Sequence, residues 1–221
     1  MDQSKFNVML VAATKPYNVP CETGEEFIAY AARVSNPANQ DNKETSSKLL
    51  RYLIREAHWS PFEMVHVVMQ IKTTRDISRQ ILRHRSFSFQ EFSQRYAQSE
   101  NFITNREARL QDTKNRQNSI ETDDKMFQIE FERAQSRVLF HAEKEYKAVL
   151  KQGIAKEQAR ALLPEGLTET TLYMAGTLRS WIHYVDLRAG NGTQKEHMEI
   201  AKQCKYILSE EYFFLHDYWD D

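Results

Sequence analysis

The sequence predicts an α+β protein in a single domain over residues 1–221, with a mixed, mainly antiparallel sheet flanked by long helices. Helical and strand periodicities alternate irregularly along the chain, without the regular βαβ units that indicate a parallel sheet. A length of 221 residues is sufficient for one sizeable core and is short for two domains. The six glycines form neither GxGxxG nor GxxxxGK, which excludes the motifs of a Rossmann dinucleotide site and of a P-loop.

The first third of the chain alternates between strand and helix signals. Residues 6–13 form an apolar run followed by turn formers, which predicts a buried strand. Thr23 and Glu26 have the spacing of a capping box, and apolar residues follow at helical intervals, so a helix is expected to begin here. An amphipathic helix is predicted at 46–57, because its leucines fall on one face. Alternation with period two at 64–72 predicts a half-buried strand.

The rest of the chain is predicted to be mainly helical. A short helix at 75–84 leads into a polar, aromatic stretch, and the charged, amide-rich residues 98–123 are predicted to be an exposed loop. A long helix is expected at 124–152, closed by Gly153. Periodicity predicts three further elements, namely a strand at 167–175 and helices at 177–189 and 193–218.

Charge and cysteine content narrow the class of protein. With 30 Lys and Arg against 31 Asp and Glu, the net charge of -1 argues against a nucleic-acid partner, because such domains are usually strongly basic. No run of 18 apolar residues is present, so we expect no membrane span, and the N-terminus does not resemble a secretory signal. Cys21 and Cys204 have no CxxC spacing, which favours a reducing, cytoplasmic location. We expect no metal site, because four histidines show no ligand pairing, namely His66, His141, His197 and His216.

The densest polar stretch of the chain is 83–96. Three arginines, one histidine, three serines and a carboxylate interleave there with three phenylalanines and a tyrosine. Guanidinium groups suit phosphate recognition, and aromatic rings stack on flat heterocycles, so a nucleotide is the simplest ligand that needs both. The residues alone leave open a second interpretation, in which this is a solvated basic turn whose phenylalanines face the core.

This stretch resembles the RHRxxSxNExSxRY signature of the flavin-dependent thymidylate synthases, with Gln90 where that family commonly has Asn. The matching residues are Arg83, His84, Arg85, Ser88, Glu91, Ser93, Arg95 and Tyr96. Other segments resemble the family in the same order, although Met64 stands where a second His is frequent. They are 32–35 (ARVS), 58–63 (HWSPFE), Gln80, 159–164 (ARALLP) and 178–183 with 187–188. The resemblance covers nearly the whole chain.

The resemblance implies an enzyme that methylates dUMP to dTMP, with carbon from methylenetetrahydrofolate and hydride from FAD that NADPH has reduced. It also implies a homotetramer whose active sites draw residues from more than one subunit. Neither cysteine lies in a matched segment, so no cysteine nucleophile is expected, and uracil C5 must be activated by electrostatics and by the flavin hydride. Arg188 and Ser93 are the implied catalytic residues. Arg188 would favour ionisation of uracil at N3, and Ser93, which has no neighbouring base in sequence, would position the substrate.

Two sets of ligand contacts follow from the resemblance. Those implied for dUMP are Gln80, Ile81, Leu82, Arg83, Glu91, Phe92, Ser93, Gln94, Arg95, Arg160 and Arg188. Those implied for FAD are Ser60, Glu63, Arg83, His84, Arg85, Glu91, Thr177, Leu178, Arg179 and His183. Arg95 and Arg160 would hold the nucleotide phosphate, and 83–85 would supply the positive charge that a pyrophosphate needs.

Two other hypotheses compete with this one. The stretch 83–96 could form a module that binds RNA or single-stranded DNA, which the near-neutral net charge disfavours. A helical assembly protein would use the long helices but would leave the polar stretch unexplained. The apolar residues of 124–152 cover more of the helix surface than a single stripe, so this helix could pack against two surfaces or lie within a core.

Overall fold

A four-stranded antiparallel sheet forms the centre of the protein, in the strand order β1-β2-β6-β3. The computed structural model describes residues 7–103 and 106–220. The strands are β1 (Asn7–Ala13), β2 (His66–Thr74), β3 (Ser88–Glu91) and β6 (Glu169–Thr177). The predicted α+β class and the antiparallel sheet are confirmed. Of the first predicted strand, Phe6 lies outside the described residues.

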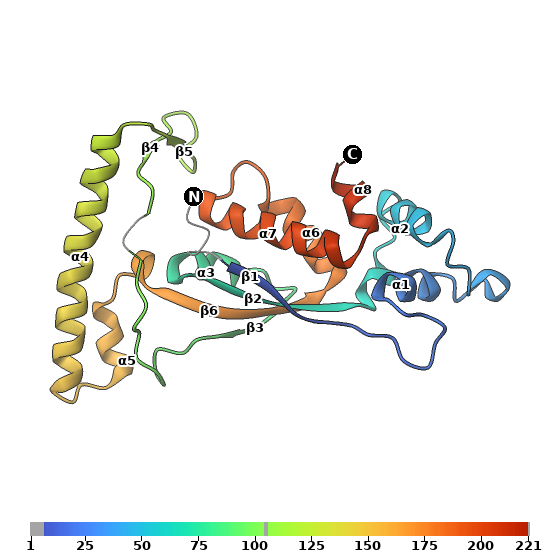
Figure 1. Ribbon diagram of the computed structural model, residues 1–221, viewed down its shortest axis with the longest axis horizontal. Helices are drawn as coiled ribbons and strands as arrows, with labels where there is room; N and C mark the ends of the chain where they lie inside the picture. The colour runs from blue at the N-terminus through green and yellow to red at the C-terminus, as the bar shows by residue number, and fades with distance from the viewer. Residues whose placement is uncertain (1–6, 104–105, 221) are drawn as a thin grey trace.

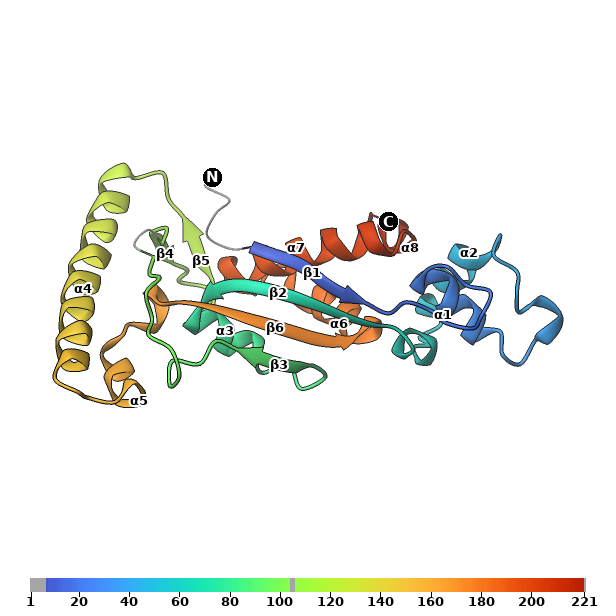
Figure 2. The ribbon, with the colours of Figure 1, turned by 60° about the horizontal axis from the view of Figure 1, so that its bottom comes forward.

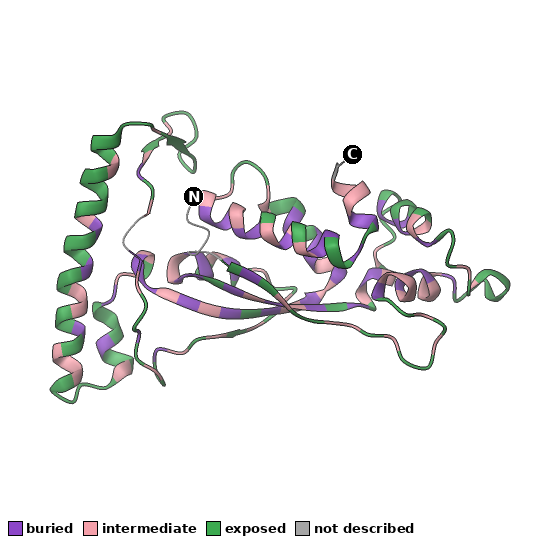
Figure 3. Cartoon of the chain, viewed as in Figure 1, coloured by how far each residue is buried: buried purple, intermediate pink, exposed green. Residues whose placement is uncertain are grey.

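Helices cover one face of this sheet (Figures 1 and 2). They are α3 (Arg75–Ile81), α6 (Leu178–Arg188) and α7 (Lys195–Glu211). Buried residues alternate with more exposed ones along β2 and β6, so each strand turns one row of side chains toward the helices (Figure 3). No helix among the described residues covers the other face, where Met9 and Tyr173 are 49% and 41% exposed.

The core between sheet and helices is built on large aromatic side chains. Trp181 and Phe62 have no exposed surface, and the buried indole of Trp181 donates to the Val67 carbonyl at 3.1 Å. Phe62 packs on Phe214 with ring centroids 5.9 Å apart. None of the helices in the described ranges is long and apolar enough to cross a membrane.

The two ends of the sheet carry separate groups of helices (Figure 1). The N-terminal helices α1 (Gly24–Ala32) and α2 (Ser46–Arg55) lie at one end, and α4 (Lys125–Lys151) and α5 (Lys156–Ala159) lie at the other. The Thr23 side chain accepts from the Glu26 amide at 3.2 Å, which confirms the predicted cap of α1.

Three segments differ from their prediction. The helix predicted at 193–218 is broken at the buried Tyr212, whose backbone is extended (φ -128°, ψ 91°), and α8 (Phe214–Asp220) begins afterwards. β3 was not predicted, because only its pairing with β6 makes it a strand. The predicted loop at 98–123 contains a small hairpin of β4 (Arg109–Gln111) and β5 (Ser119–Glu121).

Candidate functional site

Phe87 fixes the loop before β3 to the sheet. A Cβ atom at Gly176 of β6 would lie 2.5 Å from the Phe87 ring. Because Gly176 has no side chain, the ring packs directly on β6 and against Trp181, at 4.9 Å between ring centroids. The loop that carries residues 83–85 is therefore held against the N-terminal half of α6.

The four aromatic side chains of 83–96 divide into two pairs. Phe87 and Phe89 are half-buried and pack against the core, with ring centroids 6.2 Å apart. Phe92 and Tyr96 are 37% and 81% exposed. The first pair therefore matches the interpretation in which phenylalanines face the core, and only the second pair is free to stack on a ligand.

His84 holds the side chain of Arg188. The Arg188 Nε donates to His84 Nε2 at 3.0 Å, so the imidazole accepts with Nε2 and carries its proton on Nδ1. Burial and the charge of Arg188 lower the pKa of His84, which keeps the ring neutral. Arg188 makes no ion pair with a carboxylate within the described part of the chain. Its terminal nitrogens therefore remain available to an anionic ligand.

A basic cleft of about 350 Å³ lies where α3 faces α5 and the short helix η3 (Arg160–Leu162). Its lining residues are Arg75, Arg79, Gln94, Glu157, Arg160, Ala161, Leu163, Glu165 and Thr168. Gln94 and Arg160 belong to the predicted dUMP set, whereas Arg75 and Arg79 were missed. Their spacing of four residues on a predicted helix was the available signal, because it aligns both side chains on one face.

Glu91 forms the inner wall beside this cleft. Its carboxylate accepts from the hydroxyls of Ser78 at 2.8 Å and Thr170 at 2.9 Å, and pairs with Arg75 at 3.2 Å. Burial lowers the pKa of Arg75. The charge of Glu91 raises this pKa, and the charge of Arg160 lowers it further. Arg79 pairs with Glu165 and Arg95 with Glu157, so Arg160 is the arginine of the lining that makes no ion pair among the described residues.

The remaining predicted dUMP contacts vary in their access to a ligand. Ser93 Oγ accepts from the Arg95 amide at 3.4 Å, and the Arg95 guanidinium pairs with Glu157 at 3.3 Å on the rim of the cleft. Ile81 has no exposed surface, so its side chain lies in the core. The exposed residues of this set include Leu82 and Arg83.

Most of the predicted FAD contacts lie around the far end of β6, next to the loop at 83–85, where Ser180 Oγ donates to the Ser86 carbonyl at 3.3 Å. Glu91 is the exception, because it pairs with Arg75 beside the cleft. Arg179 pairs with Glu63 of the short helix η2 (Ser60–Glu63), which also contains Ser60. The His183 ring lies 4.3 Å from that of Trp59. Thr177 caps α6 through its hydroxyl, which accepts from the Ser180 amide at 3.2 Å. The Leu178 side chain is fully buried, and its amide donates to the Val65 carbonyl at 2.8 Å.

A buried polar cluster joins α3, α6 and α7 behind Arg188. His197 Nε2 lies 3.1 Å from the Tyr184 hydroxyl, and His197 Nδ1 lies 3.4 Å from Oε1 of the predicted site residue Gln80. His197 was not predicted to be a site residue. The available signal was its helical spacing from Ile200 and Cys204, which places it on the buried face of α7.

The two predicted ligand sets meet in one part of the chain, since both contain Arg83 and Glu91, and Arg188 of the dUMP set donates to His84 of the FAD set at 3.0 Å. The basic cleft, however, lies apart from the FAD contacts at the end of β6. The cleft reaches Thr168, just before β6, whereas Thr177 is the last residue of β6 and Arg179 and His183 follow it. Nine residues of strand separate them, which corresponds to about 30 Å. Among residues 7–103 and 106–220, no three His, Cys, Asp or Glu side chains gather where they could hold a metal ion.

Comparison with known proteins identifies the family. Residues 18–212 match the family described as "Thymidylate synthase complementing protein". A "Probable flavin-dependent thymidylate synthase" of Paramecium bursaria Chlorella virus 1 is 50% identical over 207 residues, covering 94% of this chain and 95% of that protein. The flavin-dependent thymidylate synthase of Synechocystis sp. is 48% identical over 211 residues, covering 94% and 96%.

The solved structures agree with this comparison. The UMP/dUMP methylase PolB from Streptomyces cacaoi, in complex with 5-Br dUMP, superposes with a TM-score of 0.81 at 27% sequence identity. The superposition covers 97% of this chain and 94% of PolB. Because the family match and both relatives span almost the whole sequence, the chain belongs to the family of the flavin-dependent thymidylate synthases.

Proposed function

We propose that this protein is a flavin-dependent thymidylate synthase that converts dUMP to dTMP, with methylenetetrahydrofolate as the carbon donor. The observation that carries the proposal is the basic cleft, where Arg75, Arg79 and Arg160 meet in a chain with these relatives. When bound, FAD reduced by NADPH supplies the hydride that completes the methyl group.

The cleft is suited to the phosphate of dUMP. A phosphate accepts charge-assisted hydrogen bonds from several guanidinium groups at once, and the lowered pKa of Arg75 reflects burial near other cations. Arg160 makes no ion pair among the described residues, and its Nε donates to the Glu157 carbonyl at 3.2 Å. Arg95 and Ser93 on the rim would complete the phosphate contacts, while Gln80 and Glu91 would fix the base and sugar.

Arg188 would activate the pyrimidine. Uracil C5 is a weak carbon nucleophile, and ionisation at N3 raises the electron density that reaches it. A fixed guanidinium beside the developing anion contributes about 3–4 kcal/mol, by analogy with one oxyanion-hole donor. Neutral His84 orients Arg188 through Nε without adding a competing charge.

The residues proposed for FAD have the chemistry that this cofactor requires. Arg83 and Arg85 are exposed and make no ion pair within the described residues, so they offer uncompensated positive charge to a pyrophosphate. His84 lies between them on the same fixed loop. The group at the far end of β6, with Arg179 and His183, would bind another part of the cofactor.

Neither cysteine is suited to act as the nucleophile. Cys204 is fully buried in the core, and burial raises the pKa of its thiol far above its usual range. Cys21 lies in the loop before α1, where burial and the charge of Glu26 raise its pKa. Both observations support a mechanism without a cysteine adduct.

A homotetramer with shared sites would bring the basic cleft of one chain close to the proposed FAD residues Arg179 and His183 of another. Within one chain the cleft and these residues are about 30 Å apart along β6. The open face of the sheet, with Met9 and Tyr173, and the long helix α4 expose apolar side chains that another copy would cover. Figure 3 shows the exposed residues of α4. The exposed apolar residues of α4 are Met126, Phe127, Ile129, Phe131, Val138 and Phe140, at 38–66%.

Product analysis tests the proposal directly. The purified protein is incubated with dUMP, methylenetetrahydrofolate, NADPH and FAD, and each component is omitted in turn. We expect dTMP only in the complete mixture, and a flavin spectrum that NADPH bleaches. A protein that takes up no FAD and binds no dUMP, but shifts oligonucleotides, would instead support the nucleic-acid-binding hypothesis.

A further inference from the structure

We propose that Gln194 and Glu196 are positioning residues that fix the orientation of the Gln80 amide, and thereby decide which hydrogen-bonding groups Gln80 presents to the nucleotide. The inference rests on the proposed function, because Gln80 is a proposed dUMP contact. The start of α7 and the hairpin β4–β5 contain no predicted site residue.

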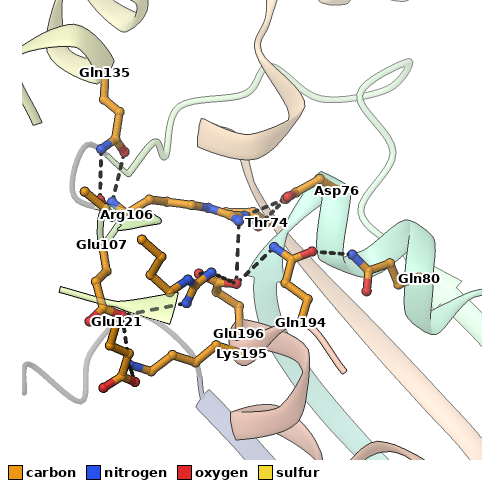
Figure 4. A network of polar contacts seen from close by, with 12 residues as sticks. Thr74, Asp76, Gln80, Arg106, Glu107, Glu121, Gln135, Gln194, Lys195 and Glu196 are labelled. Atoms are coloured by element: carbon orange, nitrogen blue, oxygen red, sulfur yellow. Dashed lines mark hydrogen bonds and ion pairs between the residues drawn. The ribbon is translucent and has the colours of Figure 1, made fainter. Parts of the chain in front are cut away.

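Three side chains form a continuous amide relay between α3 and the start of α7 (Figure 4). The Gln80 Nε2 donates to Gln194 Oε1 at 2.7 Å, and the Gln194 Nε2 donates to Glu196 Oε2 at 2.9 Å. Gln194 is the residue directly before α7, and Glu196 lies in its first turn. The relay therefore ends on a carboxylate.

Glu196 is a buried acceptor with no proton to donate. The residue is 7% exposed, and Arg109 Nη2 donates to its two oxygens at 2.8 and 2.9 Å. Burial acts to raise the pKa of Glu196, but the hydrogen bond from Arg109 and the charge of Arg106 hold it below its usual value. The carboxylate therefore stays ionised, and an ionised carboxylate only accepts hydrogen bonds.

This single acceptor fixes the direction of both amides. Gln194 must turn its NH2 group toward Glu196, which leaves its carbonyl oxygen facing Gln80. Gln80 must then turn its own NH2 group toward Gln194, which leaves its carbonyl oxygen facing His197 Nδ1 at 3.4 Å. Gln80 consequently offers a ligand one N–H and one oxygen lone pair in fixed positions, instead of an amide free to rotate by half a turn.

Residues 106–109, which lead into β4, hold the two helices of the relay in place. Arg106 Nη2 donates to Asp76 Oδ1 at 2.6 Å, and Asp76 belongs to α3, the helix that carries Gln80. Arg109 of β4 binds Glu196, and Lys195 pairs with Glu107 at 2.8 Å. Figure 4 shows these side chains meeting between the hairpin, α3 and α7. The segment therefore holds α7 in register with α3.

The dissociation constant for dUMP, measured by calorimetry on the purified holoenzyme, tests the proposal, and that for FAD is measured on the same protein after the flavin has been removed. Gln194→Met removes both relay bonds at nearly constant volume. The double variant Gln194→Glu with Glu196→Gln exchanges the carboxylate and the amide, so that Gln80 still donates to position 194. Glu199→Gln is the matched control, since it removes a carboxylate from the same helix at a side chain that is 45% exposed.

We expect Gln194→Met to weaken dUMP binding about tenfold, the effect of losing one well-oriented hydrogen bond, with FAD binding unchanged. Combined with Gln80→Ala, it should cause no further loss, because it acts through Gln80. The exchanged double variant should bind dUMP within about threefold of the wild type. Additive losses with Gln80→Ala, or an exchanged variant as weak as Gln194→Met, would overturn the inference alone. A wild-type protein that binds no dUMP would overturn the proposed function and this inference together.

Discussion

Burial of His197 makes a quantitative prediction about stability and pH. The side chain has no exposed surface, and it lies near Arg188 and His84. Burial, which is the largest cause, and the charges of these two neighbours lower the pKa of His197 from 6.5 to about 3. The folded protein therefore holds this ring neutral, whereas the unfolded chain protonates it with a pKa near 6.5.

Proton linkage gives the sign and the size of the change in unfolding free energy with pH. Because the folded pKa is depressed, protonation favours the unfolded state. The contribution of His197 to stability is fully present above pH 6.5, and it falls as the pH drops toward 3. Between pH 7 and pH 5 the loss is about 2 kcal/mol, and it depends only on the unfolded pKa because the folded one lies far below this window.

The assay compares the free energy of unfolding in urea for the wild type and for His197→Gln, at fixed protein concentration and at several values of pH. Glutamine keeps a polar group near Tyr184 and has no proton to gain. The wild type should lose about 2 kcal/mol more than the variant between pH 7 and pH 5. His141→Gln, at an exposed position of α4, is the control and should run parallel to the wild type. A constant difference between wild type and His197→Gln at every pH would refute the reasoning.

Three further predictions concern the proposed site. Arg188→Ala should lower dTMP formation about 10²–10³-fold while FAD stays bound, and turnover near the wild-type rate would contradict its proposed role. Gly176→Ala should cost about 1–3 kcal/mol of unfolding free energy, because the new methyl group meets Phe87, and an unchanged urea midpoint would be the contrary result. The double variant Cys21→Ala with Cys204→Ala should keep its turnover, since loss of activity in a folded protein would indicate a thiol step.

The elements predicted correctly are those whose signals are local. Strand β2 was predicted from its period-two alternation, and α2 from its single apolar face. β3 has a short signal of the same kind, since Phe87 and Phe89 alternate with polar residues, but four residues are too few to distinguish a strand from a polar turn without the pairing with β6. The break at Tyr212 was also missed, and there the buried tyrosine ring packs close to Gly24, a contact distant in sequence.

The sequence predicted which residues belong to the site, but it did not predict how they are arranged in space. A motif specifies residue types and spacing along one chain, so it identified Gln94 and Arg160 without Arg75 and Arg79, which line the same cleft. It also carried no information on the contact that brings Arg188 to His84, 104 residues apart in sequence. That contact follows from how the helices pack on the sheet, which is a property of the whole fold.

The buried cluster explains why Arg188 is a lone cation in its surroundings. His84 binds the arginine, and its ring lies 5.0 Å from that of Tyr184, whose hydroxyl contacts His197. Burial keeps all three groups neutral, since it lowers the pKa of both histidines and raises that of Tyr184. If either imidazole were protonated, it would repel Arg188 and compete with it for an anionic pyrimidine. Neutral partners that orient without adding charge thus leave the guanidinium free to interact with the negative charge that the proposed reaction develops.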